Sequence, residues 1–340
     1  VAGSHLLPPA HTKRDVEALF PIAAEVPMQV PDEATRLADA RALGRGVSGF
    51  ADAFHNLAPH WVIVLGDRIE ALAAALAASI GGIALAHIHG GDRAEGVADD
   101  AMRHAITKLA HLHLPATDES AQRIIRMGED PARIHTVGSP AIDTLAGIAP
   151  LGDADFRDLG APDTILLLHP VGMPDDTEQS TARACLAALD GRRILWLAPN
   201  ADPGRDGIHR ARAAAKSHPH LTLRDHLPAP IYRALIARLA SEGGLIVGNS
   251  SGALIEAAAL RCPAVDLGPR QHHRERGTNT IRVDDPSAES IRSAIARALS
   301  LDRAAITHPF GDGHASQRIA QALAASDPAA LSLLRKINAY

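Results

Sequence analysis

Cysteine is scarce in this sequence, and it contains no long apolar run. Its two cysteines, Cys185 and Cys262, are too few for a disulfide framework or a zinc site and suit free buried thiols in a reducing compartment. No apolar run reaches the about 18 residues that a membrane-spanning helix needs, and no signal peptide is recognisable. The sequence therefore predicts a soluble cytoplasmic protein without a membrane partner.

Aromatic residues and excess positive charge are scarce as well. Aromatics make up 3% of the 340 residues against 46% for all hydrophobic types, so the cores are expected to consist of Ala, Leu, Ile and Val. The formal net charge of -5, from 34 basic and 39 acidic residues, argues against nucleic acid as a partner. Because a single hydrophobic core stops growing well below this chain length, we expect two domains.

Short apolar runs alternate with helical stretches through the first half of the chain. A run that ends abruptly in glycine and charged residues is typical of a buried parallel strand whose carboxyl end opens into a loop. Strands are expected at 61–65, 83–88, 113–116 and 135–137, and helices at 69–80 and 99–109. The stretch 61–88 is therefore expected to form a β-α-β unit.

The same alternation starts again in the second half. Strands are expected at 164–168, 193–198, 221–223, 245–247 and 264–267, and helices near 177–189, 207–216, 230–239 and 253–260. The Pro-, Gly- and Asp-rich segment 149–162 is the best candidate for a linker, and 315–340 is expected to be helical with a break at Pro328. Two such runs predict an α/β protein of two Rossmann-like, doubly wound domains, 1–150 and 151–325, facing a cleft, with a helical tail at 326–340.

Acidic and imidazole side chains gather at the carboxyl ends of the first strands, the edge where open α/β sheets bind ligands. They are Asp67, His87, His89, Asp92 and Glu95. On the helix that follows, Asp99 and Arg103 share a face with Asp100 and His104. This grouping suggests proton chemistry rather than packing.

A metal site is the competing interpretation of the same histidines. His87 and His89 alternate within a strand, so both point the same way and could ligate a metal with Asp92 and His104. The chain has 19 histidines, so such coincidences are common, and we expect no metal.

A Gly/Ser turn at 248–252 follows a predicted strand and opens a helix. The small residues Ser250, Ser251 and Gly252 let the backbone approach a phosphate, and a helix N-terminus supplies free N–H groups. Glu256 would then lie within reach of a ribose hydroxyl. The alternative is an ordinary strand–helix turn with serine caps.

Three further residues lie at strand ends of the second domain. Arg270 would complete a diphosphate clamp through charge-assisted hydrogen bonds, whereas Arg274 and Arg276 fit a solvated loop better. His169 precedes Pro170, and a lone histidine at a strand end is more often structural than catalytic. Asn200 belongs either to a loop or to a second wall of a nucleotide pocket.

Together these motifs resemble the UDP-N-acetylglucosamine 2-epimerase family, specifically its hydrolysing branch. The matching segments are Leu-Gly-Asp-Arg at 65–68, His-Ile-His-Gly-Gly-Asp at 87–92, and 99–108, 168–170, 199–202, 248–252 with Glu256, and 268–271. The similarity extends from the start to about Val283. The non-hydrolysing branch usually has His-Val-Glu-Ala-Gly where this chain has 87–91, which favours the hydrolysing branch.

The resemblance implies two domains of the GT-B type, with UDP held mainly by the second, and neither NAD nor an obligatory metal. In the implied reaction the C2 proton of the sugar is removed, UDP leaves from C1 to give a glycal, and water adds to release the C2-inverted free sugar, such as N-acetylmannosamine, for sialic-acid-like biosynthesis. It implies Asp67 and Asp92 as acid/base residues assisted by Asp99 and His169. It implies a substrate site formed by Arg103, Asn200, Ser250, Ser251, Gly252, Glu256 and Arg270. A homodimer or homotetramer is expected.

Two departures from the family bear on the activity. Hydrolysing members often have Glu where this chain has Asp92, which points to a different sugar such as a bacillosamine derivative. The family's first strand, Gly-Thr-Arg loop and helix have no counterpart, because residues 1–6 already resemble its second strand. The first domain is therefore expected to lack one βα unit. A GT-B glycosyltransferase and a catalytically inactive sugar-nucleotide binder remain as alternatives.

Overall fold

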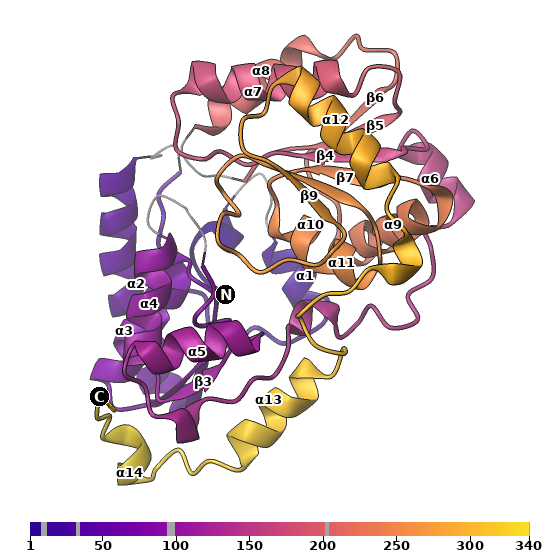
Figure 1. The fold of residues 1–340 in the computed structure, drawn as a ribbon. Helices are drawn as coiled ribbons and strands as arrows, with labels where there is room; N and C mark the ends of the chain where they lie inside the picture. The colour runs from indigo at the N-terminus through magenta and orange to yellow at the C-terminus, as the bar shows by residue number, and fades with distance from the viewer. Residues whose placement is uncertain (8–11, 32–34, 94–98, 201–203, 340) are drawn as a thin grey trace. The chain divides into compact units, whose positions relative to one another are not determined.

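The computed structural model describes residues 1–7, 12–31, 35–93, 99–200 and 204–339, except for the side chain of Asp99. The chain folds into two compact units (Figure 1). Unit 1 comprises Val1–Asp92, Ala98–Ser139 and His314–Tyr340, and unit 2 comprises Arg93–Val97 and Pro140–Gly313. The chain therefore leaves unit 1 at Ser139 and returns to it at His314.

Unit 1 contains a parallel sheet of three strands in the order β1-β2-β3. The strands are β1 (Trp61–Leu65), β2 (Ala84–Ile88) and β3 (Leu112–Leu114). Its helices are α1 (Lys13–Glu17), α2 (Arg36–Leu57), α3 (Ile69–Ile80), α4 (Asp99–Leu109), α5 (Asp118–Arg126), α13 (Ala315–Ala324) and α14 (Leu331–Leu334), with 3₁₀ turns at Gly3–Leu6 and Pro131–Arg133.

Helices cover both faces of this sheet. On one face, Leu85 of β2 packs with Ala75 of α3 and Ile106 of α4, and α2 adds its phenylalanines. On the other face, Ile319 of α13 packs in one cluster with Leu114 of β3 (Figure 1). The C-terminal segment is therefore part of the unit 1 core, although almost two hundred residues separate it from β3.

The N-terminal residues form a second small element in unit 1. Ala2 and Val26 make a single parallel bridge and pack against α2 and α3. On β1, Ile63 and Leu65 are 47% and 57% exposed, so the described residues leave one face of this strand open. The expectation that the first domain lacks a βα unit stays a prediction.

Unit 2 is built on a six-stranded parallel sheet in the order β6-β5-β4-β7-β8-β9. The strands are β4 (Thr164–Leu167), β5 (Ile194–Leu197), β6 (Leu221–Arg224), β7 (Leu245–Gly248), β8 (Ala264–Leu267) and β9 (Thr280–Val283). The winding direction reverses between β4 and β7, and this switch point is where doubly wound sheets bind ligands.

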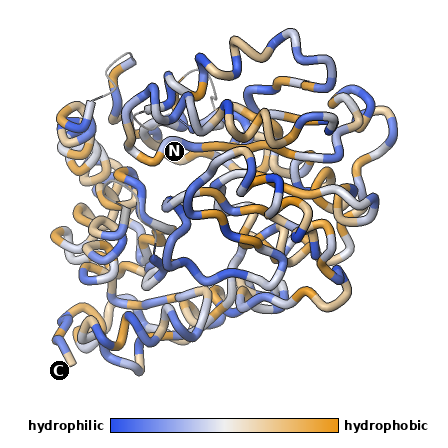
Figure 2. The backbone as a smooth tube through the Cα atoms, turned by 45° about the horizontal axis from the view of Figure 1, so that its top comes forward, coloured by the Kyte–Doolittle hydropathy of each residue, from blue (hydrophilic) through white to orange (hydrophobic). Residues whose placement is uncertain are grey.

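The unit 2 helices lie on both faces of that sheet. They are α6 (Asp153–Asp158), α7 (Asp175–Ala188), α8 (Arg205–Ala214), α9 (Ala229–Glu242), α10 (Ser251–Leu254), α11 (Glu256–Ala259) and α12 (Ala288–Leu299), with 3₁₀ turns at Pro140–Ile142 and Arg303–Ala305. Neighbouring strand residues alternate between the faces: Leu166 packs with α7, α8 and α12, and Ile165 packs with α6 and α9. Figure 2 marks hydrophobic residues along the backbone in orange.

The two cysteines belong to these two cores. Cys185 lies on the α7 face and Cys262 on the α9 face, and both thiols are free and fully buried, as expected from the sequence. Burial raises the pKa of each thiol to about 12, so neither is poised to react. Within the described residues, no helix is both long and apolar enough to cross a bilayer.

Several expected boundaries differ from the structure. The expected linker 149–162 lies inside unit 2, where Leu151, Phe156 and Leu159 are buried in the core, so the expected domain boundary at 150/151 falls within that unit. The expected tail 326–340 belongs to unit 1. The expected helical break at Pro328 is present, because this residue lies between α13 and α14. The expected helix 253–260 is divided into α10 and α11 at Ile255.

Candidate functional site

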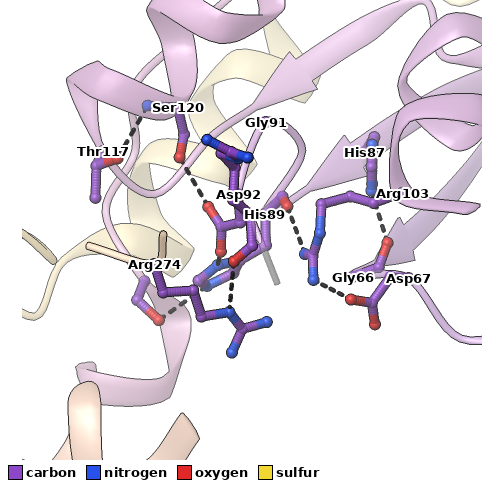
Figure 3. Close-up of polar contacts among 12 residues, drawn as sticks. Gly66, Asp67, His87, His89, Gly91, Asp92, Arg103, Thr117, Ser120 and Arg274 are labelled. Atoms are coloured by element: carbon purple, nitrogen blue, oxygen red, sulfur yellow. Dashed lines mark hydrogen bonds and ion pairs between the residues drawn. The ribbon is translucent and has the colours of Figure 1, made fainter. Parts of the chain in front are cut away.

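Asp67 lies in the loop after β1 and is held there from α4. Arg103 of α4 forms an ion pair with the Asp67 carboxylate, and its other terminal nitrogen donates to the His89 carbonyl at 3.0 Å (Figure 3). Arg103 is 2% exposed, whereas the Asp67 side chain keeps 18% of its surface open. One guanidinium therefore connects the loops that follow two adjacent strands.

His87 fixes the same loop from β2. Its ring Nε2 lies 2.9 Å from the Gly66 carbonyl and Nδ1 lies 3.1 Å from the Thr107 hydroxyl. Because burial lowers the pKa of His87 to about 3, the ring is neutral, and the carbonyl partner places its proton on Nε2. Both ring nitrogens are thus used within the protein, which gives His87 a structural role in positioning Asp67.

Asp92 follows β2 and both of its carboxylate oxygens are engaged. One oxygen lies 2.8 Å from Nδ1 of His89, and the other accepts from the Ser120 hydroxyl of α5 at 2.9 Å (Figure 3). Gly91 makes this approach possible, since it has φ +78° and a Cβ there would lie 2.2 Å from the Ser120 carbonyl. Asp92 and Asp67 therefore sit at the carboxyl ends of neighbouring parallel strands, as the sequence predicts.

For the remaining expected residues of unit 1, the structure gives less information about their roles. Asp99 is the first residue of α4, but its side chain lies outside the described residues, as does all of Glu95. Arg103 was expected to contact the nucleotide, and its described contacts are instead with Asp67 and the His89 carbonyl. A direct role of Arg103 in substrate binding stays a prediction.

In unit 2, the switch point between β4 and β7 is closed by one side chain. The Asn249 amide accepts from the His169 N–H at 2.7 Å and donates to the His169 carbonyl at 2.8 Å. Gly248 permits this closeness, because a Cβ at that position would lie 1.9 Å from the Leu167 carbonyl. The loops after β4 and β7 are thereby held together at the edge where ligands bind.

The His169 ring is prepared as a hydrogen-bond donor. Its Nδ1 accepts from the Asn200 backbone N–H at 3.0 Å. Burial, and secondarily the Arg270 guanidinium, lower the pKa of His169 to about 3, so the ring is neutral and its proton lies on Nε2. His169, expected to assist catalysis, thus lies close to Asn200 and Arg270, which were expected to bind the substrate.

The loop after β8 also reaches the β7 turn. Gln271 donates to the Asn249 carbonyl at 2.8 Å, and Arg270 approaches the same carbonyl at 3.5 Å. Arg276, expected in a solvated loop, donates to the Gln271 carbonyl and lies 3.7 Å from the buried carboxylate of Asp266. Burial raises the pKa of Asp266 to about 6, although Arg276 opposes the shift.

The Gly/Ser turn has the shape of a capped helix start. Ser250 is the N-cap of α10, and its hydroxyl accepts from the Gly252 N–H at 3.4 Å. Behind it, Glu256 accepts from Nε of Arg233 at 2.9 Å, and burial raises the pKa of the Glu256 carboxyl. Ser251 begins α10, which is one turn long. The ordinary capped turn and the phosphate site are both compatible with this geometry.

The metal interpretation finds no group of ligands in the described part of the chain. Among those residues, no three His, Cys, Asp or Glu side chains gather as a metal site would require. His87 and His89 contact protein groups with both ring nitrogens, so their alternation in the sequence reflects hydrogen bonding within unit 1.

Sequence reasoning missed the residues that hold the candidate acids and His169 in place. Ser139 lies 2.9 Å from Nε2 of His89, fifty residues along the chain, and Ser120 bonds Asp92 from α5. No local pattern marks such long-range contacts. The sequence placed Asn249 only within the turn 248–252. Its position directly after a predicted strand was a possible signal that its amide bridges two strand ends.

Comparisons with known proteins bear on the family and the fold. The family model described as UDP-N-acetylglucosamine 2-epimerase matches residues 1–324. A UDP-N,N'-diacetylbacillosamine 2-epimerase (hydrolyzing) from Legionella pneumophila is 35% identical over 94% of this chain and 85% of its own. A UDP-N-acetylglucosamine 2-epimerase from Neisseria meningitidis is 30% identical over 80% of this chain and 72% of its own.

Solved structures show the same fold. The UDP-GlcNAc 2-epimerase from Neisseria meningitidis bound to UDP-GlcNAc superposes with a TM-score of 0.74 at 17% identity, covering 93% of this chain and 90% of that one. The UDP-GlcNAc 2-epimerase from Methanocaldococcus jannaschii in complex with UDP-GlcNAc and UDP superposes with a TM-score of 0.72 at 19% identity. The match covers 85% of this chain and 82% of that one. The expected α/β fold of Rossmann-like, GT-B type units is thereby confirmed.

Proposed function

Because the chain belongs to the UDP-N-acetylglucosamine 2-epimerase family, we propose that it is a hydrolysing UDP-sugar 2-epimerase. The observation that carries the proposal is the placement of Asp67 and Asp92 at the carboxyl ends of the adjacent parallel strands β1 and β2. Two carboxylates at one sheet edge suit a reaction that removes a proton at one atom and assists a leaving or entering oxygen at the next.

The proposed reaction has two stages. A carboxylate removes the C2 proton of the sugar, the C1–O bond to UDP breaks, and the C–H electron pair forms the C1–C2 double bond of a glycal. Water then adds its oxygen to C1 while a proton returns to the opposite face of C2. The products are UDP and a free sugar inverted at C2.

The two carboxylates are held by different partners. Asp67 is paired with the Arg103 guanidinium, and Asp92 accepts from Ser120 and contacts His89. We assign both residues to acid/base work, assisted by Asp99 and His169, without dividing the two stages between them.

UDP is proposed to bind unit 2 at the switch point between β4 and β7. The support is the neutral His169 ring, whose Nε2–H has no partner among the described residues, and the Arg270 side chain nearby. Such a donor and a guanidinium suit the oxygens of a diphosphate. Ser250, Ser251 and Gly252 would add turn contacts, Asn200 a further wall, and Glu256 a ribose acceptor.

The substrate favoured by the comparisons is UDP-N,N'-diacetylbacillosamine. The Legionella relative named for that sugar covers 94% of this chain at 35% identity, and Asp92 replaces the glutamate frequent in the hydrolysing branch. UDP-N-acetylglucosamine is the second candidate, favoured by the Neisseria relative. Either product would feed sialic-acid-like biosynthesis, and a homodimer or homotetramer is part of the proposal.

The test is incubation of the protein with each UDP-sugar in deuterated water, followed by measurement of UDP release and of deuterium at C2. The proposal expects UDP, a C2-inverted free sugar and one deuterium at C2. Sugar transfer only when an acceptor is added would support a glycosyltransferase instead. Binding without turnover of either substrate would support an inactive sugar-nucleotide binder.

A further inference from the structure

We propose that His89, held in turn by Ser139, is the positioning residue for Asp92 and keeps this carboxylate ionised and aimed for the reaction. The inference rests on the proposed function, because it concerns how one of its two carboxylates is prepared. It adds to that function a residue which contacts Asp92 rather than the substrate.

The His89 ring lies between two side chains and uses both nitrogens. Nδ1 is 2.8 Å from an Asp92 oxygen, and Nε2 is 2.9 Å from the Ser139 hydroxyl. An ionised carboxylate can only accept, so Nδ1 carries a proton and donates to Asp92. The Ser139 hydroxyl, which can donate or accept, is the partner of the other ring nitrogen.

The backbone of His89 is held in a conformation that a histidine rarely adopts. Its φ is +60°, in the left-handed region. The residue is fixed from two further sides, since its N–H donates to the Leu114 carbonyl at 3.1 Å and its own carbonyl accepts from Arg103. Such a conformation persists where the surroundings over-determine it, and here it places the ring against Asp92.

Several charged groups surround this carboxylate. From α5, Arg123 donates to the Gly91 carbonyl at 3.0 Å and to the Ser120 hydroxyl at 3.3 Å. Arg103 approaches from α4, and His87 and His89 lie on the β2 side. His87 stays neutral because its pKa is about 3. Loss of the His89 donor would therefore weaken the ionised form of Asp92 without removing the nearby guanidinium groups.

The test uses His89→Asn, because asparagine tolerates the left-handed backbone but cannot reach both ring partners. We expect kcat on the UDP-sugar to fall about 10–100-fold, the loss expected for one charge-assisted hydrogen bond. We also expect the midpoint of the acid limb of kcat to move up by about one pH unit, because Asp92 then protonates more readily. KM and UDP affinity should change little.

A second variant and a control accompany it. Ser139→Ala removes one hydroxyl, so it should shift the acid limb in the same direction by a smaller amount. His111→Asn is the matched control: His111 is a buried histidine of unit 1 whose Nδ1 accepts from the Leu85 N–H at 3.0 Å. It should leave both kcat and its pH profile unchanged.

Unaltered kcat and an unaltered pH profile in folded His89→Asn would overturn the inference while the proposed function stands. If His89→Asn does not fold, Ser139→Ala decides: an unshifted acid limb in that variant rejects the inference. An equal shift in His111→Asn would also reject it, since the effect would then be general. A wild-type protein that releases no UDP from either sugar would remove the proposed function, and the inference with it.

Discussion

At the scale of single residues, the candidate acids differ from ordinary surface carboxylates in how completely they are held. Asp67 is tied to a 2% exposed arginine, and Asp92 is contacted on both oxygens. Such preparation matters because a catalytic group must already be oriented when substrate arrives. Substitutions of these acids should affect turnover, whereas substitution of Glu256 should affect UDP affinity.

Asp67→Asn and Asp92→Asn should each lower turnover by about 10²–10⁴-fold, the contribution of one positioned acid or base. UDP affinity should stay nearly constant, because the proposed phosphate contacts belong to unit 2. Steady-state kinetics with calorimetric UDP titration measures both quantities. Near-full turnover in either variant would make that residue structural.

Glu256→Ala should weaken UDP binding, since it removes the proposed ribose acceptor and the carboxylate that Arg233 pairs with. Calorimetry gives the affinity. Arg233→Ala is the matched control, because it breaks the same ion pair but keeps the carboxylate. If Glu256→Ala binds UDP as the wild type does, the ribose contact is elsewhere.

Much of the candidate site could be predicted from sequence because it depends on strand ends. Asp67 and Asp92 stand where apolar runs stop, and that position in a parallel sheet is fixed by topology. The partners Ser139 and Ser120 could not be predicted, because they come from segments distant in the chain. Arg103 was found by its spacing from Asp99, but spacing did not say which carboxylate it would meet.

At the scale of elements, unit 2 depends on the link between β4 and β7. These strands are neighbours in the sheet but are separated in sequence by β5, β6 and three helices. The two strands pair along their length. In the loops that follow them, the Asn249 side-chain amide accepts from the His169 N–H and donates to the His169 carbonyl. An amide is suited to this place, because it donates and accepts at once.

Asn249→Ala should destabilise the protein by about 1–3 kcal/mol, the cost of leaving buried polar groups without partners. It should also weaken UDP binding, because His169 is no longer fixed. Urea unfolding and calorimetry measure the two effects. Asn56→Ala, at an exposed position of α2, should stay within about 0.5 kcal/mol of the wild type. Unchanged stability and UDP affinity in Asn249→Ala would contradict the assigned role.

Two strands were predicted with the bounds that the structure has. β1 is a continuous apolar run, and β8 is a short run that contains Asp266 and ends at Gly268 and Pro269. β9 was missed because it lies at the sheet edge with three of its four residues only half-buried. The expected strand 135–137 forms only backbone bonds beside β3 and a single bridge at Ile134. Neither β9 nor the segment 135–137 has the continuous apolar run that is typical of a strand buried on two faces.

At the scale of the whole molecule, unit 1 is assembled from three separate stretches of chain. The last of them is anchored by Lys336, whose ammonium lies 2.6 Å from the buried Glu129 carboxylate. The same group donates to the carbonyls of Thr107 and Ala110 at the end of α4. His113 and Lys108 complete the surroundings of Glu129. The buried Glu129 carboxylate is thus paired with two lysines, Lys108 and Lys336, that are only partly exposed.

Lys336→Met should lower the free energy of unfolding by about 1–3 kcal/mol, because Glu129 loses one of its hydrogen-bonded cations. Burial alone would raise the pKa of Glu129, but hydrogen bonds from His113, Lys108 and Lys336 outweigh it and lower the pKa to about 2. In the unfolded chain this carboxyl has its ordinary value near 4.5, so the unfolded state takes up the proton first. Stability is therefore present above pH 4.5 and is lost as the pH falls toward 2.

The measurement is urea unfolding between pH 7 and pH 3 for the wild type and Lys336→Met. The variant should lose less stability over that interval, because its Glu129 is less strongly favoured as an ion. Lys216→Met, at an exposed position of unit 2, is the control and should follow the wild type. Parallel curves for wild type and Lys336→Met would contradict the assigned role of this contact.

The anchoring of residues 314–339 in unit 1 also has a consequence for synthesis on the ribosome. Unit 2 consists mainly of the continuous stretch Pro140–Gly313, so it can fold while the last residues are still being added. Glu129 is translated much earlier than Lys336, so their ion pair can form only after Lys336 has left the ribosome. The order of translation thus makes unit 1, which begins first, the unit that is completed last.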